Sequence, residues 1–403
     1  MNLAATFDAI TVEQLRATKS LKWCLPDQAI GAFVAEMDFG TSPVVAAALR
    51  KELDRGSFGY APPHLVEQTG AATAERLRAA HGWQVDPADV RVTPEVILVL
   101  DQVIASTTDP GTPVVVPTPA YMNFFTAIRR QGREAIEVPM IRDDRGHWTL
   151  DLPGIAAAIE RSGAQLVILC NPHNPTGRVF TREELEAFSH MVEGAGVRVF
   201  ADEIWAPIVF EEHRHIPYAS LSEATAAHTV TAVSATKGWN IAGLKCAQAV
   251  LTSDVDREAW SRMPTPLSDR TPSMGMAGTI AAYRDDSGWI DEVTAYLADC
   301  TSMVADMIGE GLPAAVVSRP EGTYVNWVDL TALDLPCPAV EFIQREARVV
   351  PTDGRSCGTV GEGHIRLIAA MPRPILRAAM SRTIQALRPR EAPGPGPALD
   401  APR

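Results

Sequence analysis

The sequence has no long hydrophobic run. No segment holds the roughly eighteen uninterrupted apolar residues of a membrane-spanning helix, so no membrane partner is expected. The first residues also lack a basic region followed by an apolar core, and they include Asp8 and Glu13. Because this start differs from a secretory signal peptide, we expect a cytoplasmic protein.

Positive charge and cysteine motifs are also scarce. The chain carries 36 Lys and Arg against 49 Asp and Glu, a net charge of -13, which argues against nucleic acid as the main partner. Its 6 cysteines are scattered without a CxxC pair. This pattern is typical of reduced thiols and predicts neither a disulfide framework nor a metal site. There is no internal repeat.

The size and composition are those of a two-domain globular subunit. The chain has 403 residues, of which 46% are hydrophobic and 21% charged. We expect an N-terminal segment (1–50) that joins a small domain, a large domain (51–275), the small C-terminal domain (276–388) and a disordered tail (389–403).

Several elements can be placed from pattern alone. A helix is expected over 43–53, with Ser42 as its N-cap and a proline at its first position. A long helical stretch over 274–309 would link the two domains. Further helices are expected at 65–81, 96–106 and 374–387, and further strands at 112–117, 314–317, 324–328 and 364–368.

Polar residues follow three neighbouring apolar runs, at 166–170, 197–201 and 230–233. Runs of this kind are typical of strands that are covered on both faces. A helical pattern over 182–192 lies between the first two, which predicts a mainly parallel sheet. Ligands bind at the carboxyl ends of such strands, so we expect a site there. The polar segments are 171–177 (NPHNPTG), 202–203 (DE) and 234–237 (SATK).

Lys237 has the sequence context of a reactive amine. It follows the third run and is surrounded by small or hydroxylated residues. An amine that is partly desolvated at the mouth of a sheet has a lowered pKa and can form a Schiff base. A lone lysine is usually a solvated surface charge, but the two upstream segments favour the reactive role.

The order NPxNPTG, DE and SxxK resembles the fold-type-I pyridoxal-phosphate (PLP) enzymes of the class I/II aminotransferase superfamily. Within it, the chain is most similar to the MalY/PatB group of cystathionine β-lyase-like C–S lyases. The likeness extends over roughly residues 20–388 and implies PLP as cofactor. It implies the aspartate aminotransferase fold, an α/β protein with a mainly parallel central sheet and a smaller α+β domain. The segments that carry the group likeness are 34–39 (VAEMDF), 58–60 (FGY), 171–177 and 240–244 (NIAGL).

The resemblance assigns roles around the PLP ring. Asn174 would hydrogen-bond the phenolic oxygen, and Asp202 would keep the ring nitrogen protonated. Tyr121 would stack on the ring; a plain turn for Asn174 and a core-covering role for Tyr121 are the alternatives. Tyr60 would reach the phosphate of a partner subunit, which implies a homodimer with shared active sites.

The phosphate would bind at a helix start. Val96 and Ile97 would offer backbone N–H groups there, assisted by Ser234 and Lys245. Lys245 stands where aminotransferases carry an arginine and gives a point charge instead of a fork, with a surface lysine as the alternative. Glu95 replaces a glycine common in relatives, and we expect its carboxylate to point away from the phosphate.

Arg366 is expected to bind the substrate. It lies in an apolar strand, where a charge needs an anion, and the resemblance assigns it the α-carboxylate. An internal ion pair is the alternative. Asp38 and Phe39 end an apolar stretch (32–39), expected as an edge strand, and would shape the substrate pocket. By the resemblance, Trp205 would stand beside the cofactor, where aminotransferases place a tyrosine. An indole can donate but not accept a hydrogen bond, so its role stays open.

Together these residues predict a PLP-dependent C–S β-lyase for an amino-acid substrate. It would cleave cystathionine or a related L-cysteine thioether to a thiol, pyruvate and ammonia, with Lys237 as the catalytic base. One alternative is a PLP-dependent aminotransferase of an L-amino acid. A second, from another class, is a PLP-binding regulator, which the absence of a DNA-binding appendage disfavours.

Overall fold

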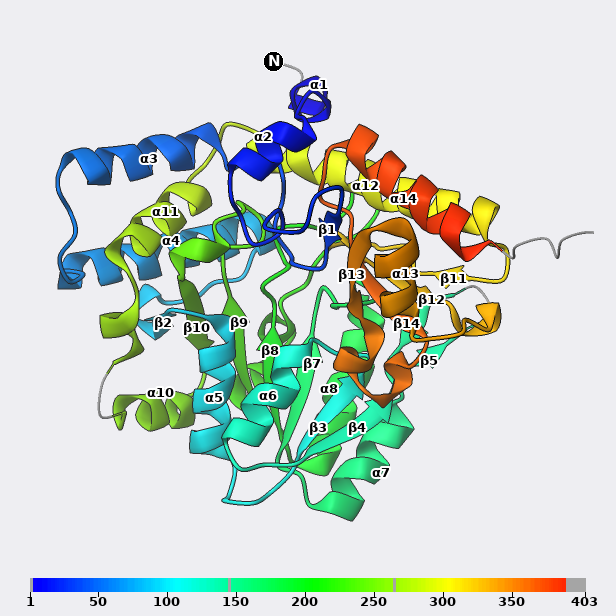
Figure 1. The fold of residues 1–403 in the computed structure, drawn as a ribbon. Helices are drawn as coiled ribbons and strands as arrows, with labels where there is room; N and C mark the ends of the chain where they lie inside the picture. Colours follow the sequence, from blue (N-terminus) through cyan, green and yellow to red (C-terminus); the bar gives the residue numbers. More distant parts are fainter. Residues whose placement is uncertain (1–2, 144–145, 264–265, 389–403) are drawn as a thin grey trace, which may run out of the picture.

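The described chain is built on two large β-sheets, with a small two-stranded ribbon beside them (Figure 1). The computed structural model describes residues 3–143, 146–263 and 266–388. A seven-stranded sheet has the order β2-β10-β9-β8-β7-β3-β4, and a five-stranded sheet has the order β1-β13-β14-β12-β11. The expected tail at 389–403 lies outside the described residues, and the domain boundaries stay predictions.

The large sheet is mainly parallel, as predicted. Only β10 runs antiparallel to its neighbours, β2 and β9. The three apolar runs form β7, β8 and β9, each within one residue of the expected bounds. The strands are β2 (Val90–Thr93), β3 (Val114–Thr118), β4 (Ala135–Pro139), β7 (Leu166–Cys170), β8 (Arg198–Asp202), β9 (Thr229–Val233) and β10 (Ala247–Leu251).

Helices cover both faces of the large sheet, which explains why its strands are apolar throughout. Leu166 and Ile168 of β7 pack with α5 and α6, whereas Val167 and Leu169 pack with α7 and α8. This alternation follows from the two-residue period of a strand. The helices around this sheet are α4 (Pro63–His81), α5 (Val96–Thr107), α6 (Met122–Arg130), α7 (Leu152–Ser162), α8 (Arg182–Ala195), α9 (Glu223–His228) and α10 (Asp254–Ser261).

The small sheet begins with an edge strand that is shorter than expected. The strand predicted over 32–39 is only β1 (Ile30–Ala32), which pairs in parallel with β13. Beyond it, the backbone carbonyls of Phe33 and Ala35 accept hydrogen bonds from side chains instead of a neighbouring strand. The other strands are β11 (Val316–Val317), β12 (Val325–Asp329), β13 (Val349–Asp353) and β14 (His364–Ile368); β5 (Ile141–Arg142) and β6 (Trp148–Thr149) form a separate ribbon.

The long helix expected over 274–309 is two helices. α11 (Ser273–Tyr283) and α12 (Trp289–Gly311) are separated by residues 284–288. The last of these, Gly288, is the N-cap of α12, and its φ of 79° belongs to the left-handed region that glycine tolerates. α12 lies beside α14 (Arg373–Leu387), and both enter one core cluster (Figure 1). No helix of the described chain is long and apolar enough to cross a membrane.

Four further helices of the described chain lie outside the large sheet and the α11–α12 and α14 layer. Ser42 caps α3 (Pro43–Asp54) by accepting a hydrogen bond from the Val44 amide, as predicted. The remaining helices are α1 (Leu3–Asp8), α2 (Val12–Ala17) and α13 (Ala339–Ala347), with short 3₁₀ turns at Pro87–Asp89, Tyr218–Ser220, Ala242–Leu244, Leu267–Arg270, Thr331–Leu333, Gly354–Cys357 and Thr359–Gly361.

Candidate active site

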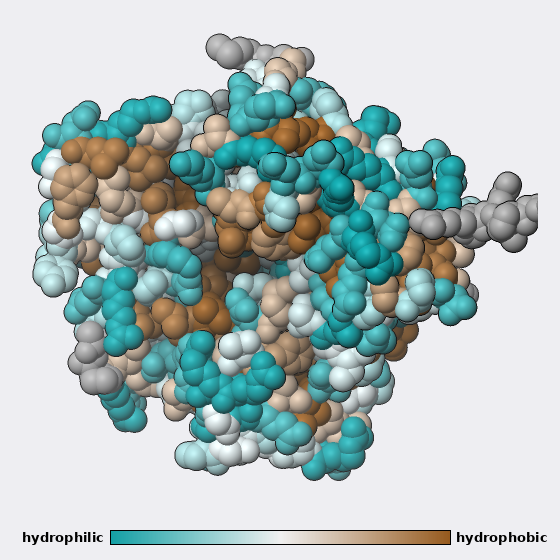
Figure 2. Space-filling model, viewed as in Figure 1, coloured by the Kyte–Doolittle hydropathy of each residue, from teal (hydrophilic) through white to brown (hydrophobic). Residues whose placement is uncertain are grey.

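A cavity of about 470 Å³ opens where the carboxyl ends of β7, β8 and β9 face the small sheet. Figure 2 shows hollows with hydrophobic walls on the face drawn in Figure 1. The start of α5 closes one side of the cavity, and residues 33–35 close another. The predicted site residues that line it are Val96, Ile97, Tyr121, Asn174, Asp202, Trp205, Ser234, Lys237, Lys245 and Arg366.

Lys237 presents its amine inside the cavity. Its Nζ donates a hydrogen bond to the Ala35 carbonyl at 3.0 Å and lies 5.7 Å from the centre of the Trp205 ring. Desolvation, with the guanidinium of Arg366 acting in the same direction, lowers the pKa of Lys237 to about 8. A substantial neutral fraction is therefore present near pH 8, as a nucleophilic or basic amine requires.

Asp202 ends β8 as a buried carboxylate, with 3% of its surface exposed. Its Oδ1 accepts a hydrogen bond from the Ile204 amide at 3.1 Å. Among the described residues, no salt bridge reaches it. Burial raises the pKa of Asp202 to about 7, and Glu203 adds repulsion in the same direction. A cationic ligand group would therefore find a ready partner here.

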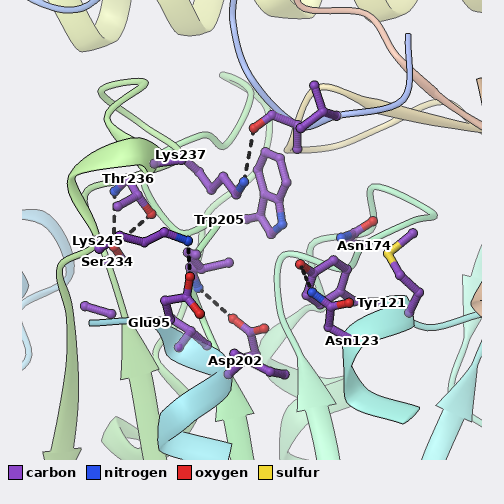
Figure 3. Close-up of a pocket in the computed structure, with 18 of the residues that line it drawn as sticks. Glu95, Tyr121, Asn123, Asn174, Asp202, Trp205, Ser234, Thr236, Lys237 and Lys245 are labelled. Carbon is purple, nitrogen blue, oxygen red and sulfur yellow. Dashed lines mark hydrogen bonds and ion pairs between the residues drawn. The ribbon is translucent and has the colours of Figure 1, made fainter. Parts of the chain in front are cut away.

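Two aromatic rings and a buried amide line the wall beside Asp202. Asn174 is 5% exposed, and its Oδ1 has no hydrogen-bond partner within the described chain. Tyr121 accepts a hydrogen bond from Asn123 Nδ2 at 2.8 Å. The indole of Trp205 lies between Lys237 and Asn174 (Figure 3). These groups fit a flat, polar ring, because they combine planar surfaces with unfilled hydrogen-bonding capacity.

The start of α5 forms the end of the cavity that is suited to an anion, together with two groups from the β9–β10 connection. Glu95 is the N-cap residue, but its side chain makes no capping hydrogen bond. The backbone N–H groups of Val96 and Ile97 are therefore not hydrogen-bonded to its carboxylate. Ser234 Oγ donates a hydrogen bond to the Cys246 carbonyl at 2.7 Å and lies 2.9 Å from Oγ1 of Thr236, a cavity residue that was not predicted. Hydroxyl and amide donors at a helix start suit a phosphate group.

The expectation that Glu95 points away is wrong. Its carboxylate lines the cavity and forms an ion pair with Lys245 Nζ (Figure 3). The attraction of this ammonium explains the orientation, because the two side chains reach the same end of the cavity from different segments. Lys245 is therefore directed into the cavity and is not an isolated surface charge.

Arg366 is buried in β14 without a carboxylate partner in the described part of the chain. Its exposed fraction is 3%, and burial lowers the pKa of its guanidinium. One terminal nitrogen donates to the Phe33 carbonyl at 3.2 Å, another lies 3.5 Å from Met122 Sδ, and Nε is unpartnered. The internal ion pair considered as an alternative is thus absent from these contacts, and a ligand carboxylate would satisfy the fork.

Asp38 and Phe39 do not line the cavity, contrary to expectation. Asp38 accepts hydrogen bonds from Lys22 Nζ at 2.9 Å and Trp23 Nε1 at 2.8 Å, so its carboxylate is already paired within the fold. Phe39 stacks on Phe7 with ring centres 4.6 Å apart. The cavity is lined instead by Phe33, Val34 and Ala35 of the same segment.

Two further groups at the cavity, the Tyr324 hydroxyl and the Ala35 carbonyl, were not predicted from the sequence. Tyr324 donates a hydrogen bond to the Ala35 carbonyl at 3.0 Å, the same oxygen that accepts from Lys237. A tyrosine in an apolar run is usually a core residue, and a backbone carbonyl leaves no signal in the sequence.

Tyr60, a predicted site residue, is 97% exposed on the loop after α3 and does not line this cavity within the single chain.

Known proteins resemble the chain over most of its length. Residues 32–382 match the family described as aminotransferase class I and II. The chain is 29% identical to cystathionine beta-lyase PatB of Bacillus subtilis, covering 93% of this chain and 98% of that protein. It is 31% identical to the protein MalY of Escherichia coli, covering 88% and 90%. The PLP-bound C–S lyase from Staphylococcus hominis superposes with a TM-score of 0.87 at 27% identity, covering 94% and 98%.

Proposed function

Because the chain belongs to the aminotransferase class I and II family, we propose that it is a PLP-dependent C–S β-lyase. Its substrate would be cystathionine or a related L-cysteine thioether, and its products a thiol, pyruvate and ammonia. One observation carries the proposal. Lys237, Asp202 and Arg366 face one cavity without an ion-pair partner among the described residues, in a chain that lyases match almost end to end.

The residues present fit PLP. The buried carboxylate of Asp202 would hold the protonated ring nitrogen, and Asn174 would hydrogen-bond the phenolic oxygen with the capacity that is unfilled in the protein alone. Tyr121 would cover one ring face, while the start of α5 and Lys245 would bind the phosphate. When bound, PLP supplies an electron-accepting ring that stabilises negative charge at the substrate Cα.

The chain's own groups divide the remaining work. Arg366 would bind the substrate α-carboxylate and so orient the Cα–H bond. The amine of Lys237, kept partly neutral by desolvation, would take that proton. The Ala35 carbonyl, which accepts a hydrogen bond from this amine in the cofactor-free fold, would orient it while it is not bonded to the cofactor. Loss of the proton and of the thiolate from Cβ leaves a three-carbon fragment that water converts to pyruvate and ammonia.

Turnover without a keto acid separates lyase from aminotransferase. We expect the PLP-loaded protein to release pyruvate, ammonia and a thiol from L-cystathionine, or from another cysteine thioether, over many cycles. Aminotransfer would leave the amino group on the cofactor and stop after one event per site. Pyruvate is measured with a coupled dehydrogenase and thiol with a chromogenic disulfide.

The Arg366→Ala variant tests the carboxylate contact. It should lower kcat/KM by about 30-fold or more, equivalent to roughly 2 kcal/mol, because a charge-assisted contact to the carboxylate is lost. A single burst of product per site that resumes only when a keto acid is added would instead favour the aminotransferase.

The functional unit is proposed to be a homodimer with shared active sites. Tyr60 is almost fully exposed beside the exposed Phe58 and would contact the phosphate bound by a second copy. Sedimentation of the PLP-loaded protein should give a dimer. Tyr60→Phe should weaken PLP binding by about tenfold, the effect of one hydrogen bond to a charged group, without changing the sedimentation coefficient. An active monomer would contradict this proposal.

The cysteines support a cytoplasmic location. All six thiols are free, and most of them are buried. Burial raises the pKa of Cys246 to about 12, so that thiol stays protonated and unreactive. A compartment that keeps thiols reduced is compatible with this pattern.

A further inference from the structure

Glu95 occupies an unusual position at the start of α5. The N-cap of a helix is commonly a residue whose side chain accepts a hydrogen bond from the first turn, yet Glu95 makes none. Its carboxylate turns instead to Lys245, which reaches it from the connection between β9 and β10 (Figure 3). Both side chains are partly exposed, 37% for Glu95 and 52% for Lys245.

The ion pair of Glu95 and Lys245 lies at the end of the cavity that is suited to an anion. Lys245 has a φ of 54° and a ψ of 65°, a left-handed backbone conformation that is uncommon for a residue with a side chain and that sets the direction of its Cα–Cβ bond. The hydroxyls of Ser234 and Thr236 line the same cavity from the same connection. The Glu95 carboxylate is thus the negative group that Lys245 meets when no phosphate is present.

We propose that Glu95 is an internal competitor for the phosphate group of PLP. Its carboxylate holds Lys245 in the cofactor-free protein and releases it when the phosphate binds. Glu95 is then left beside a group of the same sign. The inference rests on the PLP site of the proposed function but not on the lyase reaction.

The sign of the effect follows from charge. A phosphate at the α5 start gains the helix dipole and Lys245 but meets a nearby carboxylate. The same site without that carboxylate would bind the phosphate more tightly. Partial exposure screens the repulsion, so the expected gain is about tenfold in Kd, equivalent to about 1.4 kcal/mol. A cofactor held in this way exchanges more readily than one held by an uncontested cation.

The opposite role would give the opposite sign. If Glu95 served to position Lys245 for the phosphate, its removal would free the ammonium to move and would weaken binding. Glutamine keeps the size of the side chain and removes its charge, so Glu95→Gln distinguishes competition from positioning.

The test measures PLP affinity of the full-length protein by equilibrium dialysis, with folding checked by circular dichroism. Glu95→Gln should bind PLP about tenfold more tightly, and the gain should shrink at high salt. Lys245→Met should bind PLP less tightly. In the Lys245→Met background, Glu95→Gln should gain less, because no ammonium remains to be released. Glu258→Gln, which removes the exposed ion pair with Arg262 away from the cavity, is the matched control and should leave the affinity unchanged.

An unchanged or weaker affinity of Glu95→Gln would overturn the inference while leaving the proposed function intact. A chain that binds no PLP in any variant would overturn both. Inorganic phosphate gives a second readout: in equilibrium dialysis with the PLP-free protein, it should bind Glu95→Gln more tightly than the unmodified chain. Equal phosphate affinity would count against competition.

Discussion

Lys237→Ala is expected to abolish turnover and to leave PLP unattached. Of the two lysines that line the cavity in the described chain, Lys237 is the one whose amine lies over the Trp205 ring and whose charge acts on Asp202. Loss of both the covalent anchor and the base should lower kcat/KM by at least about 10⁴-fold. Borohydride treatment of the PLP-loaded protein, followed by peptide mapping, should place the label on Lys237.

Lys237→Arg is the matched control. It keeps the positive charge but stays protonated at every accessible pH, so it should be as inactive as the alanine variant. The pH dependence carries a further check. Because only the neutral amine attacks an aldehyde, covalent PLP uptake by the unmodified chain should accelerate as the pH rises through about 8 and then level off. A label on any other lysine would refute the assignment.

Asp202→Asn is expected to inactivate the enzyme and yet stabilise the PLP-free protein at alkaline pH. The carboxyl pKa rises from 3.8 in the unfolded chain to about 7 in the fold, so the folded state binds the proton more tightly. The contribution of the Asp202 carboxyl to the free energy of unfolding is fully present below pH 3.8. It declines as the pH rises from 3.8 to about 7. Asparagine removes that loss, which amounts to a few kcal/mol at most.

Without PLP, the free energy of unfolding of Asp202→Asn should therefore exceed that of the unmodified chain by more at pH 8.5 than at pH 5.5. Activity should fall by about 10²-fold or more, since a neutral amide cannot hold a charged ring nitrogen. Asp101→Asn is the control: Asp101 is buried but paired with Arg130, so its variant should lose stability. If Asp202→Asn also lost stability at pH 8.5, the carboxylate would have a partner in the cofactor-free fold.

The sequence was most informative where strands are buried on both faces. β7, β8 and β9 give uninterrupted apolar runs, so their ends could be predicted to within one residue. Asn174, Asp202 and Lys237 follow those ends, and their meeting in one cavity follows from the parallel order.

Groups that depend on distant partners could not be predicted. The direction of Glu95 depends on Lys245, 150 residues away in the chain, and the burial of Asp38 depends on Lys22. β13 was missed because Pro351 within it argues against a strand. The break before α12 was missed because a single glycine also occurs within helices.

The Phe33 and Ala35 carbonyls, which hold Arg366 and Lys237, have a consequence for how this site changes in evolution. The groups that position both cations are main-chain atoms, so they persist when the side chains of that segment are exchanged. Sequence drift in the segment is therefore tolerated as long as the chain path is kept. An inserted or deleted residue there would displace both cations together, even if every side chain of the cavity were retained.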